Sequence, residues 1–268
     1  IFDEFEEQVF SDHSLGKNIL GTPKHINSFD KKMINEFINR NYLTHEMVIS
    51  SVGDITMDKL ISLVEKHFAH IPKSQTNRSQ LAFSNYQKKN ITINKKGFQS
   101  HCIIGNEAYG IKHPKKTPLT LLNNILGGPG MNSRLNLAVR EKYGFTYSIE
   151  SNYTPYSDTG IFSVYLASDR DKINRSIKLT KKELIKLCEK PLGTLQLKKA
   201  KQQLIGQIAI GQENDVNLML SLGKSVLLYN KVDTFEIVKE KVEAVSSSQI
   251  LEVANEIFNE DNLSHLIY

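Results

Sequence analysis

Hydrophobic residues recur at helical spacing over much of the chain, and this pattern predicts a series of amphipathic helices. Residues 1–10 read as the end of one helix, Ser28 or Asp30 caps a second, and Thr56 opens a third. Later helices are predicted at about 117–126, 132–142, 214–229 and 246–258. Two more lie between these, with buried faces formed by Ile173, Ile177, Leu184 and Leu187 in one and by Leu197, Ala200, Leu204 and Ile208 in the other.

Apolar runs with alternating character predict strands between these helices. One strand is predicted at 46–53, in the first part of the chain. The second part is predicted to hold strands at 89–95 and 99–108, a hairpin formed by 145–154 and 159–168, and a last strand at 263–268. The chain thus mixes predicted helices with predicted strands, two of which alternate like a hairpin.

A polar segment separates the two parts. Residues 70–88 hold Pro72 and then a run rich in Ser, Gln, Thr and Asn, a composition typical of linkers. We therefore predict a first domain over 1–72, a linker over 73–85 and a second domain over 86–268.

An internal repeat connects the two predicted domains. The tetrapeptide SLGK at Ser14–Lys17 recurs at Ser221–Lys224. Further on, five positions match at one constant shift: Phe29, Ile34, Phe37, Tyr42 and Met47 correspond to Val245, Ile250, Val253, Phe258 and Leu263. The repeat predicts a tandem of homologous domains, the second nearly complete and the first truncated, without its opening half.

Composition narrows the functional classes. Hydrophobic residues make up 40% and charged residues 24%, which allows a packed core, and the net charge of +5 is spread along the chain rather than gathered in a nucleic-acid-binding arm. No run approaches the roughly 20 apolar residues of a membrane span, so we predict neither a nucleic-acid nor a membrane partner. Cys102 and Cys188 lie in apolar contexts and predict reduced, buried thiols and a cytoplasmic location. Because Ile1 stands inside a helical pattern, we expect the natural amino terminus to lie upstream.

Metal-binding and nucleophilic motifs are scarce. Of the eight histidines, only His67 and His70 lie close together, and neither H-E-x-x-H nor H-x-x-E-H occurs, so we expect no metal site in this chain. An unrelated metalloprotein that uses His67 and His70 stays an open alternative. His101 and Cys102 are neighbours on a predicted strand and point to opposite faces, which excludes a catalytic pair. The loop Gly127–Gly130 lacks a G-K-[ST] ending and indicates a tight entry to the next helix.

The most informative stretch is LGGPGMNSRLNLAVREKYGFTYSI, from Leu126 to Ile149. A glycine loop leads into a helix whose buried stripe is predicted to hold Met131, Leu135, Ala138 and Val139, and a strand follows on which Phe145, Tyr147 and Ile149 share one face. A reversal at Gly144 then brings Arg140, which lies off the stripe, beside Tyr147. Both side chains are hydrogen-bond donors, although a surface arginine and a half-buried tyrosine explain the same residues.

This stretch resembles the second-domain motif of the pitrilysin-type (M16) zinc peptidases, LGG…SRL…REK.G..YS. Phe10–Thr22 is similar to the family's first-domain segment that follows its metal-binding helices, and Asn41–Gly53 resembles the helix–strand unit that closes this domain. The resemblance implies a tandem of homologous α+β domains, in agreement with the repeat.

The resemblance also implies a zinc-dependent endopeptidase that acts on peptides or unfolded polypeptides. Its zinc ligands, in an H-x-x-E-H motif and a distant glutamate, would lie upstream of Ile1, so zinc is expected in the intact protein, none in this chain, and this chain alone is expected to be inactive. Tyr147 would hydrogen-bond the scissile carbonyl as it becomes an oxyanion, and Arg140 would hold a neighbouring substrate carbonyl. A homodimer or a heterodimer with another M16 subunit is expected. The alternative is a non-catalytic M16-like partner or peptide-binding subunit of a heteromeric protease.

Overall fold

The computed structural model describes residues 1–74 and 81–268, which form two compact units. The sheet unit comprises Ile1–Ile19, Leu81–Leu204 and Glu240–Tyr268, and the helical unit comprises Ile205–Lys239 and the described part of Leu20–Gln80. These units cut the chain differently from the domains predicted at 1–72 and 86–268, because residues 1–19 pack with the second part of the sequence. The predicted boundaries concern homologous domains rather than compact units and stay a prediction; part of the linker, 75–80, lies outside the described residues.

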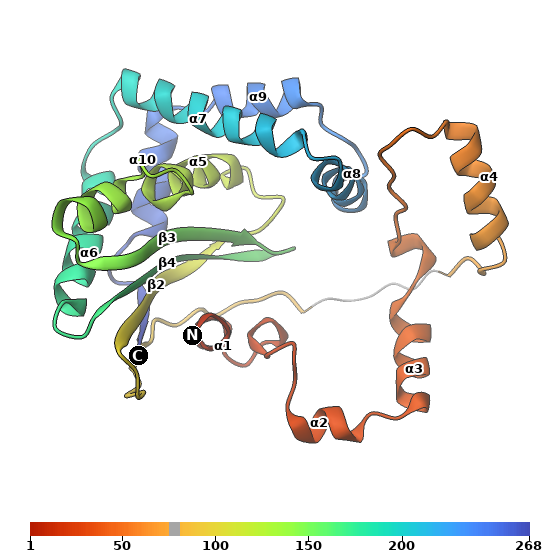
Figure 1. The fold of residues 1–268 in the computed structure, drawn as a ribbon, viewed down its shortest axis with the longest axis horizontal. Coiled ribbons are helices and arrows are strands. Elements are labelled where there is room, and N and C mark those ends of the chain that lie inside the picture. Colours follow the sequence, from red (N-terminus) through yellow and green to blue (C-terminus); the bar gives the residue numbers. More distant parts are fainter. Residues whose placement is uncertain (75–80) are drawn as a thin grey trace. The chain divides into compact units, whose positions relative to one another are not determined.

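The sheet unit is built on five strands in the order β1-β5-β2-β4-β3 (Figure 1). Their bounds are β1 Asn90–Thr92, β2 Gln99–Tyr109, β3 Thr146–Pro155, β4 Thr159–Asp169 and β5 Ser264–Ile267. All neighbours pair antiparallel except β1 and β5, which are parallel. The five predicted strands of the second part are thus present, and the α+β class is confirmed.

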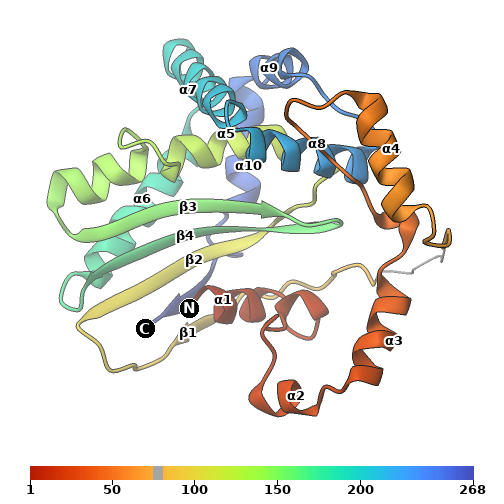
Figure 2. The same cartoon turned by 45° about the vertical axis from the view of Figure 1, so that its right-hand side comes forward.

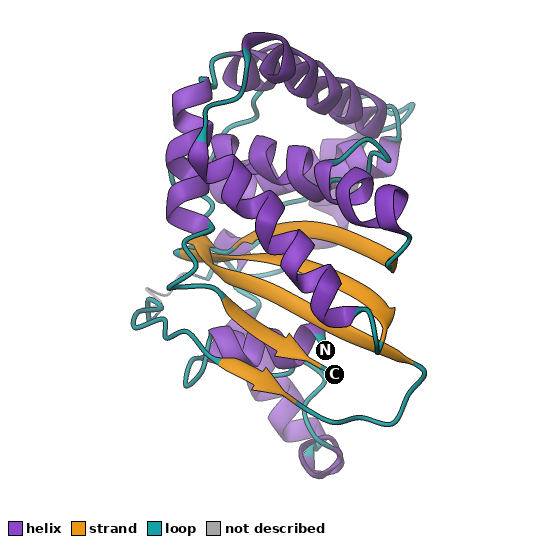
Figure 3. Ribbon diagram, turned by 90° about the vertical axis from the view of Figure 1, so that its left-hand side faces the viewer, coloured by secondary structure: helices purple, strands orange, loops and turns teal. Residues whose placement is uncertain are grey.

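Helices cover one face of this sheet. They are α5 Lys116–Gly127, α6 Ile173–Glu189 and α10 Ser247–Ile257, which contact the strands and one another (Figure 3). Along β2 and β4, residues that face the helices alternate with residues of the other face. Those on the helix side include Cys102, Ile104, Val164 and Leu166, all fully buried. The sheet is therefore buried on the helix side by ordinary strand alternation.

The opposite face of the sheet is covered by α1, Phe2–Val9 (Figure 2). Phe5, Val9 and Phe10 form a core cluster with Ile103, Ile161 and Leu266. Gln8 adds a polar tie, because its Nε2 donates to the carbonyl oxygens of Lys89 at 2.6 Å and His265 at 3.3 Å. This packing places the first residues of the sequence in the sheet unit.

The remaining elements follow the predicted pattern with one addition. The long helix α7 runs over Thr194–Gln212 and α8 over Asp215–Tyr229, as expected, but α9 at Phe235–Glu243 was not predicted. It is a nine-residue helix in which only Val242 is buried. No helix among the described residues has the length and apolar character needed to cross a membrane.

The helical unit contains α2 Pro23–Ser28, α3 Lys31–Asn41 and α4 Met57–Phe68, together with α8. The predicted caps are confirmed: Asp30 accepts a hydrogen bond from Met33 N at 2.7 Å, and Thr56 accepts one from Lys59 N at 3.4 Å. The apolar stripe of α3, however, lies exposed, with Ile34 at 51%.

The strand predicted at 46–53 is wrong for this chain. A 3₁₀ turn, η2, occupies Thr44–Glu46, and the backbone that follows is unpaired as far as Gly53. Met47, Val48 and Ile49 are all more than a third exposed, and the segment is tied to α8 by a hydrogen bond from Ser50 Oγ to Met219 O at 2.8 Å. A strand needs a neighbour to satisfy its backbone groups, and no described strand lies beside this one.

Candidate functional site

The glycine loop at the end of α5, Gly127–Gly130, packs closely against β3. A Cβ added at Gly127 would lie 2.6 Å from Ser151 N and 3.0 Å from Leu135 Cδ1, and one added at Gly128 would collide with Asn124 Oδ1. Ser151 Oγ in turn donates to Asn123 O at 3.0 Å. Close packing against β3 and within α5 therefore requires glycine at both positions.

The helical segment that follows carries Arg140. Its central part, η3 Asn136–Glu141, is π-helical, and Leu135 and Val139 are buried on its inner side as predicted. Met131 is not part of this buried stripe: it is 70% exposed, because it lies in a turn before the helix begins. The Arg140 side chain is 46% exposed, with Nε 4.0 Å from Glu141 Oε1.

Tyr147 occupies a β-bulge in β3. Thr146 pairs with Ser168 and Ser148 pairs with Ala167, the next residue back along β4, which leaves Tyr147 as the extra residue. The prediction that Phe145, Tyr147 and Ile149 share one face is therefore wrong. Thr146 and Ile149 are buried at 5% and 4% exposure, whereas Tyr147 is 61% exposed. The bulge shifts the alternation by one residue and turns the phenol out of the core.

The Tyr147 hydroxyl donates a hydrogen bond to Asp169 Oδ1 at 3.0 Å, where β4 ends. Lys172 Nζ forms an ion pair with Asp169 Oδ2 at 2.7 Å. The hydrogen bond to the carboxylate raises the pKa of Tyr147, and the hydrogen bonds from Lys172 and then Tyr147 lower the pKa of Asp169. At neutral pH the phenol thus keeps its proton and acts as a donor.

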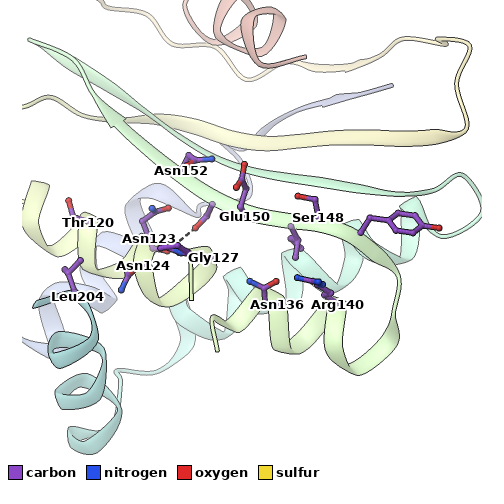
Figure 4. Close-up of a pocket in the computed structure, with 15 residues that line it drawn as sticks. Thr120, Asn123, Asn124, Gly127, Asn136, Arg140, Ser148, Glu150, Asn152 and Leu204 are labelled. Carbon is purple, nitrogen blue, oxygen red and sulfur yellow. Dashed lines mark hydrogen bonds between the residues drawn. The ribbon is translucent and has the colours of Figure 1, made fainter. Parts of the chain in front are cut away.

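Arg140 and Tyr147 border the same cavity, of about 410 Å³, within the sheet unit. The chain reverses between them at Gly144, whose φ of 61° lies in the left-handed region. Figure 4 shows the walls of this cavity: α5, the glycine loop, η3, β3 and one residue of α7. The lining residues besides these two are Thr120, Asn123, Asn124, Gly127, Gly128, Pro129, Asn136, Ser148, Ile149, Glu150, Ser151, Asn152 and Leu204.

The sequence analysis did not identify the asparagines of this cavity as candidate site residues. Asn123 and Asn124 stand in the otherwise apolar run Leu121–Leu126, and Asn136 and Asn152 reach the cavity from η3 and β3. An asparagine pair inside an apolar helix was the available signal, because such residues are poor helix formers and costly to bury.

A zinc ion finds no ligand set in the residues that the structure describes. No group of three or more His, Cys, Asp or Glu side chains that could hold a metal gathers within 1–74 and 81–268. His67, in α4, and His70, just after it, are both exposed. The described residues therefore do not fit the zinc site that the family resemblance implies for an intact protein.

Comparison with known proteins identifies the family. The model of the peptidase M16 inactive domain matches residues 28–204. An uncharacterized zinc protease of Rickettsia felis is 31% identical over 267 residues, covering 100% of this chain and 64% of the relative. The chain belongs to the M16 peptidase family.

Two further likenesses agree. The uncharacterized zinc protease YmxG of Bacillus subtilis is 28% identical over 267 residues, again with 64% of its length covered. The crystal structure of a peptidase M16 inactive domain from Pseudomonas fluorescens superposes with a TM-score of 0.85 at 19% identity, over 99% of this chain and 64% of that one, which shows the shared fold. The chain thus spans 64% of the length of the curated relatives.

Proposed function

We propose that this chain supplies the substrate-carbonyl-binding wall of a zinc-dependent metalloendopeptidase that cleaves peptides or unfolded polypeptides. Family membership and the relatives named zinc proteases support the reaction class. In this proposal the zinc ion and its ligands lie outside this chain, upstream of Ile1, and the chain alone is inactive.

The observation that carries the proposal is the bulge at Tyr147. It leaves Tyr147 61% exposed at the border of the cavity that Arg140 also lines, with its protonated hydroxyl hydrogen-bonded to Asp169. We assign Tyr147 to donate a hydrogen bond to the scissile carbonyl oxygen as it gains negative charge, and Arg140 to hold a neighbouring substrate carbonyl with its guanidinium fork. Donors aimed at a developing oxyanion stabilise the transition state more than the ground state, which is how they accelerate the reaction.

The test is Tyr147→Phe in the peptidase that contains this chain, assayed with a fluorogenic peptide. Loss of one oxyanion donor typically lowers kcat by about 10²–10³-fold, so a fall of this order is expected while zinc content and melting temperature stay unchanged. Tyr143→Phe is the matched control, because Tyr143 is 44% exposed and does not border the cavity. An unaltered kcat for Tyr147→Phe would contradict the proposed role of Tyr147 as an oxyanion donor.

A second candidate function is a non-catalytic M16-like partner or peptide-binding subunit of a heteromeric protease, which holds peptide for an active subunit. It is favoured by the match to a domain described as inactive. The sequence encoded upstream of Ile1 discriminates the two functions: an intact H-x-x-E-H motif supports the enzyme, and a degraded one supports the partner.

A further inference from the structure

The α5 wall of the cavity is a polar stripe on an otherwise apolar helix. Thr120, Asn123, Asn124 and Gly127 all line the cavity, and their spacing of i, i+3, i+4 and i+7 places them on one face of α5. Figure 4 shows these residues along α5, with Asn152 on the neighbouring strand β3. The leucines of the helix, Leu119, Leu121, Leu122 and Leu126, are fully buried.

The amides of this stripe lack partners in the described part of the chain. Asn123 Oδ1 is buried without a hydrogen-bond donor. Asn124 is 7% exposed, and its side chain takes part in no hydrogen bond between described residues. Thr120, by contrast, is satisfied, because its Oγ1 donates to Lys116 O at 2.9 Å. A buried amide oxygen normally has a partner, so the unpaired Asn123 Oδ1, beside a second asparagine whose side chain makes no hydrogen bond to a described residue, indicates a wall kept for a bound molecule.

The chemistry of the stripe selects the kind of group that it can bind. An asparagine amide offers two donors and one acceptor oxygen, the same functions that another amide group needs. The stripe carries no charge, whereas the charged members of the cavity, Arg140 and Glu150, come from η3 and β3. A neutral amide thus matches this wall better than a carboxylate or an ammonium group, which would lose its hydration without gaining an opposite charge.

We propose that Asn123 and Asn124 form a substrate subsite that hydrogen-bonds a neutral amide group next to the scissile bond. The inference rests on the proposed function, since Arg140 and Tyr147 border the same cavity and define where the scissile carbonyl lies. An extended peptide offers an amide in its main chain at every residue, about 3.3 Å apart, and asparagine or glutamine side chains offer a second source of the same group. The asparagines are specificity and positioning residues rather than catalytic ones.

The test compares Asn123→Leu and Asn124→Leu with Asn106→Leu. Leucine has nearly the same size and shape as asparagine but cannot form hydrogen bonds. Asn106 is buried, at 4% exposure, and is satisfied, because its Nδ2 donates to Ile257 O at 3.1 Å. A binding role predicts that either α5 variant raises KM by about five- to tenfold while its melting temperature is unchanged or higher, because an unpaired polar group has left the interior. Asn106→Leu is expected to lower the melting temperature.

Two results would overturn the inference. If KM stays unchanged in both α5 variants, the amides bind only water. If the melting temperature of both falls as it does for Asn106→Leu, the amides are structural. A series of substrates separates the two sources of the amide group. Replacing one peptide bond by an ester weakens binding if the subsite binds the main chain. Replacing glutamine by norleucine weakens binding if the subsite binds a side chain.

The outcome is distinguishable from failure of the proposed function. Peptide affinity is measured separately by fluorescence anisotropy, without turnover. If Tyr147→Phe lowers kcat but the asparagine variants bind peptide normally, the proposed function stands and the subsite fails. If the asparagine variants weaken peptide binding about five- to tenfold while Tyr147→Phe leaves kcat unaltered, the subsite stands and the oxyanion role fails.

Discussion

The hydroxyl of Tyr147 donates its hydrogen bond to Asp169, 3.0 Å away, rather than into the cavity that Tyr147 borders. Asp169 is held in turn by Lys172 at 2.7 Å. A carboxylate is a stronger acceptor than a peptide carbonyl, so Asp169 competes with the substrate oxygen that Tyr147 is proposed to bind. The phenol must leave this acceptor, or share its proton between two, when the scissile carbonyl gains charge.

Asp169→Asn tests this competition. The neutral amide oxygen is a weaker acceptor, so the pKa of Tyr147 is expected to fall toward that of an ordinary tyrosine, and kcat/KM of the intact peptidase to rise severalfold. The pKa is measured by NMR of ring-labelled tyrosine. Asp171→Asn is the control, because Asp171 affects Tyr147 through charge alone and accepts no hydrogen bond from it. A lower kcat/KM for Asp169→Asn would instead make Asp169 a residue that positions the phenol.

Arg140→Ala is expected to weaken substrate binding without unfolding the chain. The guanidinium is half-exposed, and its nearest carboxylate is 4.0 Å away on the adjacent residue, so the stability change is expected within about 0.5 kcal/mol. KM should rise by about tenfold or more, and Arg140→Lys should recover only part of the loss, because lysine lacks the planar fork. A collapse of the melting temperature would show that Arg140 is structural.

Gly127→Ala should destabilise the sheet unit. The added methyl group would lie 2.6 Å from Ser151 N, where the backbone of β3 has no room to yield. We expect a loss of about 1–3 kcal/mol in the free energy of unfolding, measured by urea denaturation. Gly206→Ala in α7 is the matched control: nothing lies within 4 Å of its added Cβ, and alanine should stabilise the helix by about 0.5–1 kcal/mol. Equal effects at the two glycines would contradict the close approach of the loop to β3.

Cys102 should make stability depend on pH in alkaline solution. Burial raises the pKa of its thiol from 9.0 to about 12. Below pH 9 the thiol is protonated in both states and has no effect. Between pH 9 and about 12 only the unfolded chain releases the proton, so the free energy of unfolding falls by about 1.4 kcal/mol per pH unit from this group.

Cys102→Ser removes this contribution, because serine does not ionise in that range. Urea denaturation at pH 8 and pH 10 is therefore expected to show a smaller loss of stability for Cys102→Ser than for the native chain. Cys188→Ser serves as the comparison: burial raises the pKa of this partly buried thiol too, but less than for Cys102, so a smaller effect is expected. The same burial predicts that iodoacetamide modifies Cys188 before Cys102 in the folded protein. Faster modification of Cys102 would show that β2 opens locally.

Several features followed from local sequence alone. Asp30 and Thr56 cap their helices because a short polar side chain before an apolar repeat satisfies the first free N–H groups, whatever packs beside it. The local sequence also predicted the strands of the second part. It likewise singled out Gly127 and Gly128 before η3 and the family motif around Arg140. These are properties of a few neighbouring residues.

The two wrong strand predictions depended on neighbours in space. Residues 46–53 have the apolar content of a strand, yet a strand exists only where another one accepts its hydrogen bonds. Tyr147 would share a face with Ile149 in a regular strand, but pairing with β4 leaves it as an extra residue. Neither the missing partner nor the bulge is written in the local pattern.

The sequence by itself determined the family and the α+β class and proposed the pair Arg140 and Tyr147, because these depend on residue types at fixed spacing. Only the tertiary structure decided that α1 covers the second part's sheet, that Asp169 accepts a hydrogen bond from Tyr147 and that Asn123 Oδ1 is buried at the cavity wall without a partner among the described residues. The reason is physical: hydrophobic periodicity reports which face of an element is buried, but not which distant segment buries it or which polar group it leaves without a partner.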